Sequence, residues 1–450
     1  MNHVSGFQGE VFAFYVEYQE WRNAIKPEKK VRKYRHIDAP IDLNNDNSFR
    51  DIIKAINDIK NHQFLPFIKR AETVVRFRKN KEGKLQRSPK TRPIMYASHI
   101  DSHIYSFFNF IIQNKYLSHL ITLGINDSVI AYRKVEIGNT NKGKSNIHFA
   151  KEVFDYIQTL DETVVVTQDI EGFFDNINHK LLKENLCKIL NIERLDVGLF
   201  KVFKSLTKYR YIEWTHFEDK NIYRKIKQNK YAIYRALAGV FVENKTNKGI
   251  PQGSPISGLL ANILLINFDN DVKINFPEIF YRRYSDDLVF VCKKVQEEEL
   301  LKFIDVKINE SFLKINAKKS FISYFKYNNG KIVCEKVTDG LHKTLGRNYV
   351  DYLGLEFEGS KVFLRKNTIQ KLKRKQISKV EKQVSNTLKQ TRRKPKKVKG
   401  VKVKNRSNYF KKAVQVVDNP GINNQVLKVT KDRNKVKQKT LSVLKRRAIS

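Results

Sequence analysis

Two adjacent aspartates at the tip of an expected β-hairpin constrain this chain more than any other feature. They stand in Tyr284-Ser285-Asp286-Asp287, inside apolar runs rich in aromatic and β-branched residues that extend over residues 279–292. This pattern predicts a strand, a tight turn and a returning strand. Neighbouring carboxylates repel one another unless cations neutralise them, so the turn indicates a divalent metal site. Alone the string is a weak signal, because an aromatic-x-Asp-Asp string arises by chance in roughly one chain in ten of this length, and a solvated turn is the simpler interpretation.

Charge and length limit the class of protein. The net charge of +41 over 450 residues points to a polyanionic partner, RNA or DNA, with an anionic membrane surface as the second interpretation. The length predicts two or three subdomains with a large core. The three cysteines lie far apart and form no CxxC pair, so we expect no disulfide framework, no zinc site and a cytoplasmic location. We also expect neither a signal peptide nor a membrane span, because no suitable apolar run occurs.

A strongly basic hairpin is expected over residues 73–96. Its cations include Lys84, Arg87, Lys90 and Arg92. A solvated basic hairpin is one interpretation, and a flap that grips phosphates is the other. An apolar helix at about residues 99–119 follows at once and favours the flap, and an amphipathic helix is expected earlier, at 47–60.

A Gly-x-x-x-x-Gly-Lys-Ser string from Gly138 to Ser145 matches the phosphate-binding P-loop pattern. A P-loop requires a buried strand before it and a helix after it in a parallel sheet. No second strand of the kind that binds magnesium in such proteins is evident, so we interpret the string as a basic loop.

A third acid stands at the end of another expected strand. Residues 162–168 are rich in β-branched residues, and Asp169 follows directly. Gly172 allows a close backbone approach, which suits a metal ligand at Asp169, although a turn aspartate is the simpler interpretation. Asn178 is a good N-cap for a helix over residues 179–190.

Residues 204–248 mix aromatic residues with cations. This composition suits single-stranded nucleic acid, but it fits a half-buried antiparallel extension equally well. A Pro/Gly/Ser-rich turn containing Gln252 and Gly253 then leads into a long apolar helix that extends to about residue 272. The start of such a helix suits an anion or a base pair.

The last part of the chain becomes more basic. A helix is expected at 297–317, a strand at 321–325 and a tight strand pair at 352–357. From residue 361 onward there are 30 Lys and Arg residues and 3 acids, a net +27. We expect a helical stretch, then a basic linker over residues 391–406 and a further helix at about 422–448, all suited to phosphate backbones.

If the strands carrying Asp169 and the Asp286–Asp287 turn are neighbours in one antiparallel sheet, the three carboxylates meet. They could then hold two Mg²⁺ ions, for which Mn²⁺ can substitute, together with substrate phosphates. Such a centre serves phosphoryl transfer, which depends on positioning and charge neutralisation.

The order of these motifs resembles that of reverse transcriptases over about residues 70–360. The motifs are Arg92-Pro93-Ile94, Asp169, Pro251-Gln252-Gly253-Ser254-Pro255, Tyr284-Ser285-Asp286-Asp287, Lys319-Ser320 and Leu353-Gly354. The resemblance implies an α+β right-hand polymerase of fingers, palm and thumb, with an antiparallel palm sheet and a basic helical C-terminal region. The expected divisions are an N-terminal helical extension (1–72), fingers (73–160), a palm (161–358, with an insertion at 204–248), a thumb (359–390) and a basic linker and helix (391–450).

The resemblance also implies residue roles. Asp169, Asp286 and Asp287 would be the catalytic metal ligands, with the Ile170 carbonyl as an extra ligand. The nucleotide would lie against Arg92, which binds the triphosphate, and Gln252 and Gly253, which touch the nucleotide or template base. Lys319 would be the acid for the leaving group, and Phe174 a steric gate against the ribose 2′-hydroxyl. Tyr284, Lys84, Arg87 and Lys90 would contact nucleic acid.

Within the family the chain looks most similar to the defence-associated (unknown-group) bacterial reverse transcriptases. The Ala131-Tyr132-Arg133 string and the basic C-terminus fit that group. The resemblance implies an RNA template that is a dedicated noncoding RNA, a DNA product, dNTP substrates and a role in antiviral defence. A second reverse transcriptase or another defence subunit is a further candidate partner. The alternatives are a retron-type or group II intron-type reverse transcriptase, an RNA-dependent RNA polymerase, or a non-catalytic RNA-binding scaffold. The sequence identifies neither the template nor the priming mode.

Overall fold

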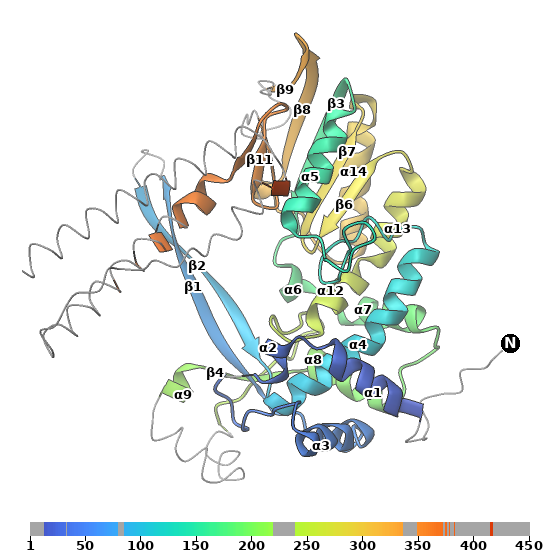
Figure 1. Ribbon diagram of the computed structural model, residues 1–450, viewed down its shortest axis with the longest axis vertical. Coiled ribbons are helices and arrows are strands. Elements are labelled where there is room, and N and C mark those ends of the chain that lie inside the picture. The colour runs from blue at the N-terminus through green and yellow to red at the C-terminus, as the bar shows by residue number, and fades with distance from the viewer. Residues whose placement is uncertain are drawn as a thin grey trace, which may run out of the picture.

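A central antiparallel sheet surrounded by helices forms the body of the protein, and a long two-stranded arm projects from it (Figure 1). The computed structural model describes residues 13–32, 34–79, 85–218, 239–335 and 349–371, with a few isolated positions as far as 416. The expected thumb helix therefore lies mostly outside the described residues, and the expected linker and C-terminal helix lie almost entirely outside them.

The central sheet has five strands in the order β6-β7-β3-β8-β9. Their bounds are β3 Glu162–Asp169, β6 Phe280–Tyr284, β7 Asp287–Cys292, β8 Phe321–Asn328 and β9 Lys331–Glu335. Every neighbouring pair is antiparallel. This confirms the expected antiparallel sheet, with the strand that ends at Asp169 directly beside the hairpin strand that begins at Asp287.

Side chains of the middle strand alternate between two separate cores, as the period of a β-strand requires. Val164 and Val166 of β3 pack into the larger, mainly helical core, whereas Val165 packs into a smaller core on the opposite face. The smaller core lies under α5 (Asn146–Gln158) and a three-stranded sheet. That sheet consists of β10 Val350–Tyr352, β11 Leu355–Phe357 and β12 Val362–Leu364.

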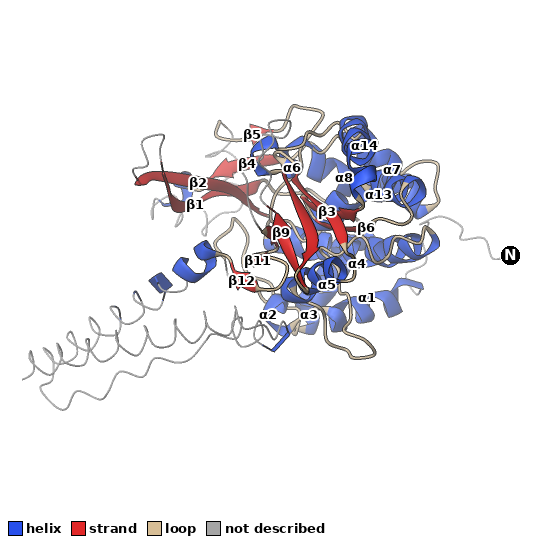
Figure 2. Ribbon diagram, turned by 90° about the horizontal axis from the view of Figure 1, so that it is seen from above, coloured by secondary structure: helices blue, strands red, loops and turns tan. Residues whose placement is uncertain are grey.

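The arm is the basic hairpin expected from the sequence, and it is longer than expected. Strands β1 (Phe67–Lys79) and β2 (Leu85–Tyr96) pair antiparallel along almost their whole length. Viewed from above, they extend well beyond the helical body (Figure 2). Two short strands complete the arm's sheet, because β4 (Arg210–Glu213) pairs parallel to β1 and β5 (Val242–Glu243) pairs with β4.

The described part of residues 204–248 joins the sheet of the basic arm. Its strand β4 pairs antiparallel with β5, but its pairing with β1 is parallel. The aromatic ring of Tyr211 lies under the Lys69 ammonium of β1, 4.6 Å from the ring centroid. An aromatic residue of this stretch therefore packs against β1, which supports the structural interpretation of the pattern.

Twelve helices in the described parts of the chain are long enough to name, counting α5. The others are α1 Ala13–Ala24, α2 Pro27–Lys30, α3 Asp46–Asn57, α4 His99–Thr122, α6 Phe173–Asn176, α7 His179–Leu190, α8 Val197–Thr207, α9 Thr215–Glu218, α12 Ser257–Leu264, α13 Ile266–Asn275 and α14 Glu297–Glu310. The expected cap of α7 is confirmed, since the Asn178 side chain accepts a hydrogen bond from the Leu181 N–H at 3.0 Å. Among these helices none is long and apolar enough to cross a membrane.

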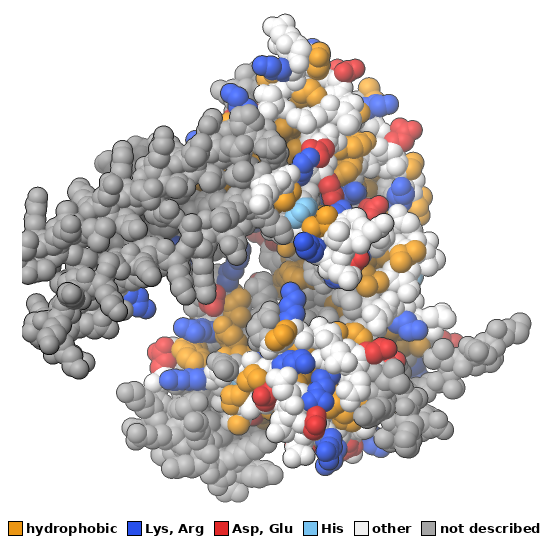
Figure 3. Space-filling view, in the orientation of Figure 1, with side chains coloured by type: hydrophobic (Ala, Val, Ile, Leu, Met, Phe, Trp, Pro, Cys, Tyr) orange, Lys and Arg blue, Asp and Glu red, His pale blue; other side chains and the backbone are white. Residues whose placement is uncertain are grey.

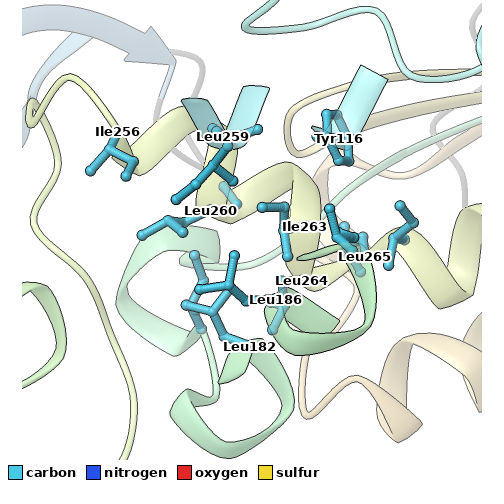
Figure 4. Close-up of a cluster of buried hydrophobic side chains, with 14 of the residues drawn as sticks. Tyr116, Leu182, Leu186, Ile256, Leu259, Leu260, Ile263, Leu264 and Leu265 are labelled. Carbon is cyan, nitrogen blue, oxygen red and sulfur yellow. The ribbon is translucent and has the colours of Figure 1, made fainter. Parts of the chain in front are cut away.

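Two helices differ from the sequence expectation. The apolar helix after Gln252 is broken at Leu265 into α12 and α13. The helix expected to reach residue 317 ends at Glu310, because Phe312 adopts a left-handed backbone (φ 59°) that terminates a helix. Helix α12 lies at the centre of the larger core, where its leucines and isoleucines meet those of α7 and the ring of Tyr116 (Figure 4).

A fully buried ion pair joins the hairpin of β6 and β7 to α13. Arg283 of β6 donates from Nη2 to Asp269 Oδ2 at 2.5 Å and from Nε to Asp269 Oδ1 at 2.8 Å, and neither side chain is exposed. Tyr281 also donates to Asp269 at 2.7 Å. Removing one partner of such a pair leaves the other charge buried without compensation.

We therefore expect Arg283→Ala to lower the free energy of unfolding by about 3–5 kcal/mol. The control is Lys302→Ala, which removes an exposed i,i+4 pair with Glu298 and should change stability little. Urea unfolding of both variants measures the difference. Similar losses in the two variants would contradict a structural role for the buried pair.

Candidate active site

The strand register brings the three sequence-predicted aspartates to one end of the central sheet. Asp169, the last residue of β3, lies directly opposite Asp287, the first residue of β7. Tyr284 and Asp287 close the β6–β7 hairpin, so that Ser285 and Asp286 form its two-residue turn. The Ile170 N–H donates to the Asp286 carbonyl at 3.0 Å and fixes the turn against the end of β3.

The turn has an uncommon backbone conformation. Ser285 adopts a positive φ of 61°, and Asp286 does not, which is the pattern of a type II′ turn. A non-glycine residue pays a strain cost in this region of backbone space. Ser285 is buried, and its hydroxyl lies 3.0 Å from the hydroxyl of Tyr132. The turn is therefore held by the contact between Ser285 and Tyr132 as well as by the backbone pairing of β6 with β7.

Burial and nearby negative charges raise the pKa values of Asp286 and Asp287. Burial raises the pKa of Asp287 to about 7, and the charges of Asp286 and Asp169 contribute to the rise. Burial and the charge of Asp169 also raise the pKa of Asp286. Groups shifted by burial and by like charges are typical of functional sites.

A lysine supplies the nearest positive charge. The Lys319 ammonium contacts Asp169 Oδ1, and the Asn316 N–H donates to the Asp169 carbonyl at 2.7 Å. Across the described residues, no three acidic, histidine or cysteine side chains are already arranged around one ion position. The donor set nevertheless fits hard divalent cations, which bind oxygen ligands. Three carboxylates converge at this point, and the Lys319 ammonium neutralises only part of their charge.

A large cavity of about 1480 Å³ opens beside these residues, and most of the predicted nucleotide site lines it. Its walls include the predicted residues Asp169, Ile170, Asp286, Tyr284, Arg92, Phe174, Gln252, Gly253 and Lys319. Asp287 is not part of the wall. Lys84 lies outside the described residues, and the side chains of Arg87 and Lys90, whose backbone belongs to β2, are not described.

The turn before α12 is tied to the base of the arm. The Gln252 carbonyl accepts a hydrogen bond from the Met95 N–H of β2 at 2.7 Å. Gly253 has a φ of 111°, and a Cβ added to it would lie 2.9 Å from the Met95 carbonyl oxygen. A side chain at this position would clash with the Met95 carbonyl, so glycine allows the approach. Gln252 and Phe174 of α6 both line the cavity.

The P-loop-like string does not form a phosphate cradle. Its loop closes on itself through Ile137 N–H to the Lys142 carbonyl at 2.9 Å and Lys144 N–H to the Val135 carbonyl at 2.7 Å. The Lys144 ammonium pairs with Glu152 at 2.6 Å. Because the loop's amides and lysine are already engaged, the interpretation as a basic loop is supported over that as a P-loop.

Sequence reasoning missed two residues of this site. Tyr132 lines the cavity, and its ring stands edge-on to that of Phe174, with centroids 6.3 Å apart at 86°. Asn316 holds the backbone of Asp169 from the segment that follows α14. No local pattern marks Asn316, whereas the Ala131-Tyr132-Arg133 string was visible but carried no assigned role.

The shifted pKa of Asp287 gives a stability prediction. Well below pH 4 the Asp287 carboxyl is protonated in both the folded and the unfolded state, so its ionisation does not affect the free energy of unfolding there. As the pH rises from about 4 to 7, the unfolded state ionises freely while the folded state resists, so stability is lost across that interval. Asp287→Asn removes this loss.

In buffer without divalent cations, we expect Asp287→Asn to have the same melting temperature as the wild type near pH 4 and a higher one at pH 8. Thermal unfolding across this pH range measures the difference. The control is Asp305→Asn, a change on the surface of α14. A difference between wild type and Asp287→Asn that does not grow with pH would rule out the proposed repulsion.

Comparisons with known proteins identify the domain that carries this site. The family model described as "Reverse transcriptase (RNA-dependent DNA polymerase)" matches residues 139–357, which include all three aspartates. No curated protein matches the chain.

Solved structures give only distant similarities. A telomerase from Candida albicans in complex with a fragment of telomeric RNA is 12% identical, with a TM-score of 0.40, and the match covers 94% of this chain and 59% of that one. Apo telomerase from Candida tropicalis, truncated from its C-terminal domain, is 12% identical, with a TM-score of 0.38 and coverage of 69% and 58%. An RNA polymerase complex inside a double-stranded RNA virus is 11% identical, with a TM-score of 0.39 and coverage of 73% and 28%.

The chain thus spans less than two thirds of the length of these solved structures. The family match is the informative comparison, and it agrees with the site built from the residues. Residues 139–357, which contain the three aspartates, are therefore similar to the reverse transcriptase (RNA-dependent DNA polymerase) family.

Proposed function

We propose that this protein is an RNA-directed DNA polymerase that adds dNTPs to a 3′ hydroxyl by two-metal phosphoryl transfer. The observation that carries the proposal is the convergence of Asp169, Asp286 and Asp287 at the end of the central sheet, beside a cavity of about 1480 Å³. A purely structural hairpin has no need to accumulate three repelling carboxylates.

The metal ions of the proposed reaction are Mg²⁺, with Mn²⁺ as a substitute. Asp169, Asp286 and Asp287 would hold them, with the Ile170 carbonyl as a further ligand. When bound, the two ions supply charge neutralisation and lower the pKa of the attacking hydroxyl. Lys319, which contacts Asp169 in this structure, must then give way, and its ammonium becomes free to protonate the leaving group.

The remaining cavity residues would position and select the nucleotide. Arg92, at the base of the arm, is exposed in the wall and suits a triphosphate. Gln252 offers both a donor and an acceptor to a base. The Phe174 ring would exclude a 2′-hydroxyl, which favours dNTPs over rNTPs. Tyr284, and Lys84, Arg87 and Lys90 of the arm, would contact the nucleic acid.

The proposed domain assignment follows from this reading. The arm of β1 and β2 would form the fingers, the central sheet the palm, and the segment after β12 the start of the thumb. The face in Figure 3 shows Lys and Arg side chains spread over both the upper and the lower part of the described body, interspersed with acidic ones. Together with the net charge of +41, this suits a polyanionic template and product.

We further propose a dedicated noncoding RNA as template and a role in bacterial antiviral defence. The support is the sequence resemblance to the defence-associated group, including Ala131-Tyr132-Arg133 and the basic C-terminus. Sequencing the nucleic acids that co-purify with the wild type and with an Asp286→Ala, Asp287→Ala double variant tests it. One RNA species enriched with both, and DNA complementary to it only with the wild type, is the expected result, and random cellular RNA in both would contradict it.

Asp286→Ala should reduce dNTP incorporation by at least about 10³-fold, because one of the carboxylates that hold the catalytic ions is lost. Primer extension on an RNA template with Mg²⁺ measures the rate. The control is Asp271→Ala, whose carboxylate lies on α13, 3.1 Å from the Lys307 ammonium and away from the cavity wall. Incorporation that survives in Asp286→Ala would exclude the proposed centre.

Phe174→Ala distinguishes a DNA polymerase from an RNA polymerase built on the same palm. Removing the ring should raise rNTP incorporation by roughly 10-fold or more relative to dNTP incorporation, because the clash with the 2′-hydroxyl disappears. Competing dCTP and CTP on one template measure the ratio. A wild type that already prefers CTP, with no change in the variant, would favour an RNA-dependent RNA polymerase instead.

A further inference from the structure

Tyr132 occupies a position between the predicted sugar gate and the catalytic turn that the family match does not explain. Its φ of 60° lies in the left-handed region, which bulky residues rarely adopt. Its ring is half exposed and lines the main cavity. Such backbone strain persists only where the surroundings enforce it, and it is concentrated at functional sites.

The segment that carries Tyr132 is fixed on both sides. Along β6, the Ile130 N–H donates to the Arg283 carbonyl at 3.1 Å, and the Arg283 N–H donates to the Ser128 carbonyl at 2.7 Å. From α12, the Asn262 side chain donates to the Ala131 carbonyl at 2.8 Å. The backbone next to Tyr132 is therefore held by the catalytic hairpin and by the helix that follows the Gln252 turn.

Helix α12 leaves space for the ring at Gly258. A Cβ added to Gly258 would lie 2.6 Å from both Cγ and Cδ1 of Tyr132. This is far inside ordinary contact distance, so the absence of a side chain at Gly258 is what allows the ring to rest on the helix. The ring is thus supported from behind by backbone rather than by a movable side chain.

From that support the side chain reaches two functional groups. The Tyr132 and Phe174 rings are nearly perpendicular, with centroids 6.3 Å apart and an interplanar angle of 86°. This edge-to-face arrangement is favourable for two aromatic rings. The hydroxyl lies 3.0 Å from Ser285 Oγ, inside the turn that presents Asp286. Both Tyr132 and Ser285 have left-handed backbones, so the hydrogen bond joins two strained positions.

We propose that Tyr132 is a specificity-determining residue. Its ring holds Phe174 against the 2′ position of the incoming sugar, and its hydroxyl couples that gate to the catalytic turn through Ser285. The inference rests on the proposed polymerase function. In this proposal the Tyr132 and Phe174 rings select the sugar together, and Gly258 leaves the space on α12 in which the Tyr132 ring lies.

The test compares dCTP and CTP, which differ only in the 2′-hydroxyl, in single-nucleotide extension of a DNA primer on an RNA template. The readout is the ratio of kcat/KM for the two nucleotides within one preparation. The fraction of folded or active protein cancels in this ratio, so a variant that merely folds less well leaves it unchanged.

Four variants separate the parts of the proposal. Tyr132→Ala should lower the preference for dCTP by roughly 10-fold, and Gly258→Ala, which pushes the ring away, should lower it in the same direction. Tyr132→Phe keeps the ring, so it should keep the ratio within about twofold while slowing both nucleotides. Combining Tyr132→Ala with Phe174→Ala should lower the ratio no further than Phe174→Ala alone, because both act through one ring.

The control is Phe200→Ala, an exposed aromatic residue on α8 outside the cavity wall, which should leave the ratio at the wild-type value. If Tyr132→Ala and Gly258→Ala keep the wild-type ratio while Phe174→Ala lowers it, Tyr132 does not support the gate and the inference is overturned. If the wild type extends no primer with either nucleotide, the proposed polymerase function fails instead, and the two failures are thereby distinguished.

Discussion

Repulsion among three carboxylates at the end of one sheet is the constraint around which this structure is arranged. The pairing of Asp169 with Asp287 brings charges together that would separate in an unrestrained chain. The ladder of the central sheet, the buried pair of Arg283 with Asp269 and the Lys319 ammonium hold them in place. The sheet and the buried Arg283–Asp269 pair therefore keep the three acids close together, whereas the Lys319 ammonium offsets part of their repulsion.

The cavity beside the acids is built from elements that belong to different parts of the chain. The arm contributes Arg92, the turn before α12 contributes Gln252 and Gly253, and the segment before α5 contributes Tyr132. Backbone hydrogen bonds join these elements directly, as between Gln252 and Met95. The wall of the cavity is consequently joined to the base of the arm by direct hydrogen bonding.

Local sequence patterns predicted most helices and strands, but they could not predict which distant strands pair with one another. The hairpin at residues 279–292, the strand before Asp169 and the Asn178 cap follow from alternation and capping rules that act over a few residues. The parallel pairing of β4 with β1 joins residues far apart in sequence, so the sequence could not show that part of residues 204–248 belongs to the sheet of the arm. The early end of α14 at Glu310 was missed because a positive φ at a phenylalanine has no signal in composition. Within the site, the acids were recognisable because their chemistry is unusual, whereas the shortest contact of Asn316 with Asp169 is through its backbone N–H, which every residue type except proline possesses.

The contact between Lys319 and Asp169 has a consequence for how the protein is made. The two residues are 150 positions apart, and both strand partners of β3 follow it in the sequence, β7 before Lys319 and β8 after it. Closing such long loops is slow, and it must follow the synthesis of everything between them. When the ribosome has synthesised the arm and β3, the nascent chain therefore contains Asp169 but not yet Asp286, Asp287 or Lys319. The proposed active site would therefore be complete only late in translation, after the segment that follows α14 has been synthesised.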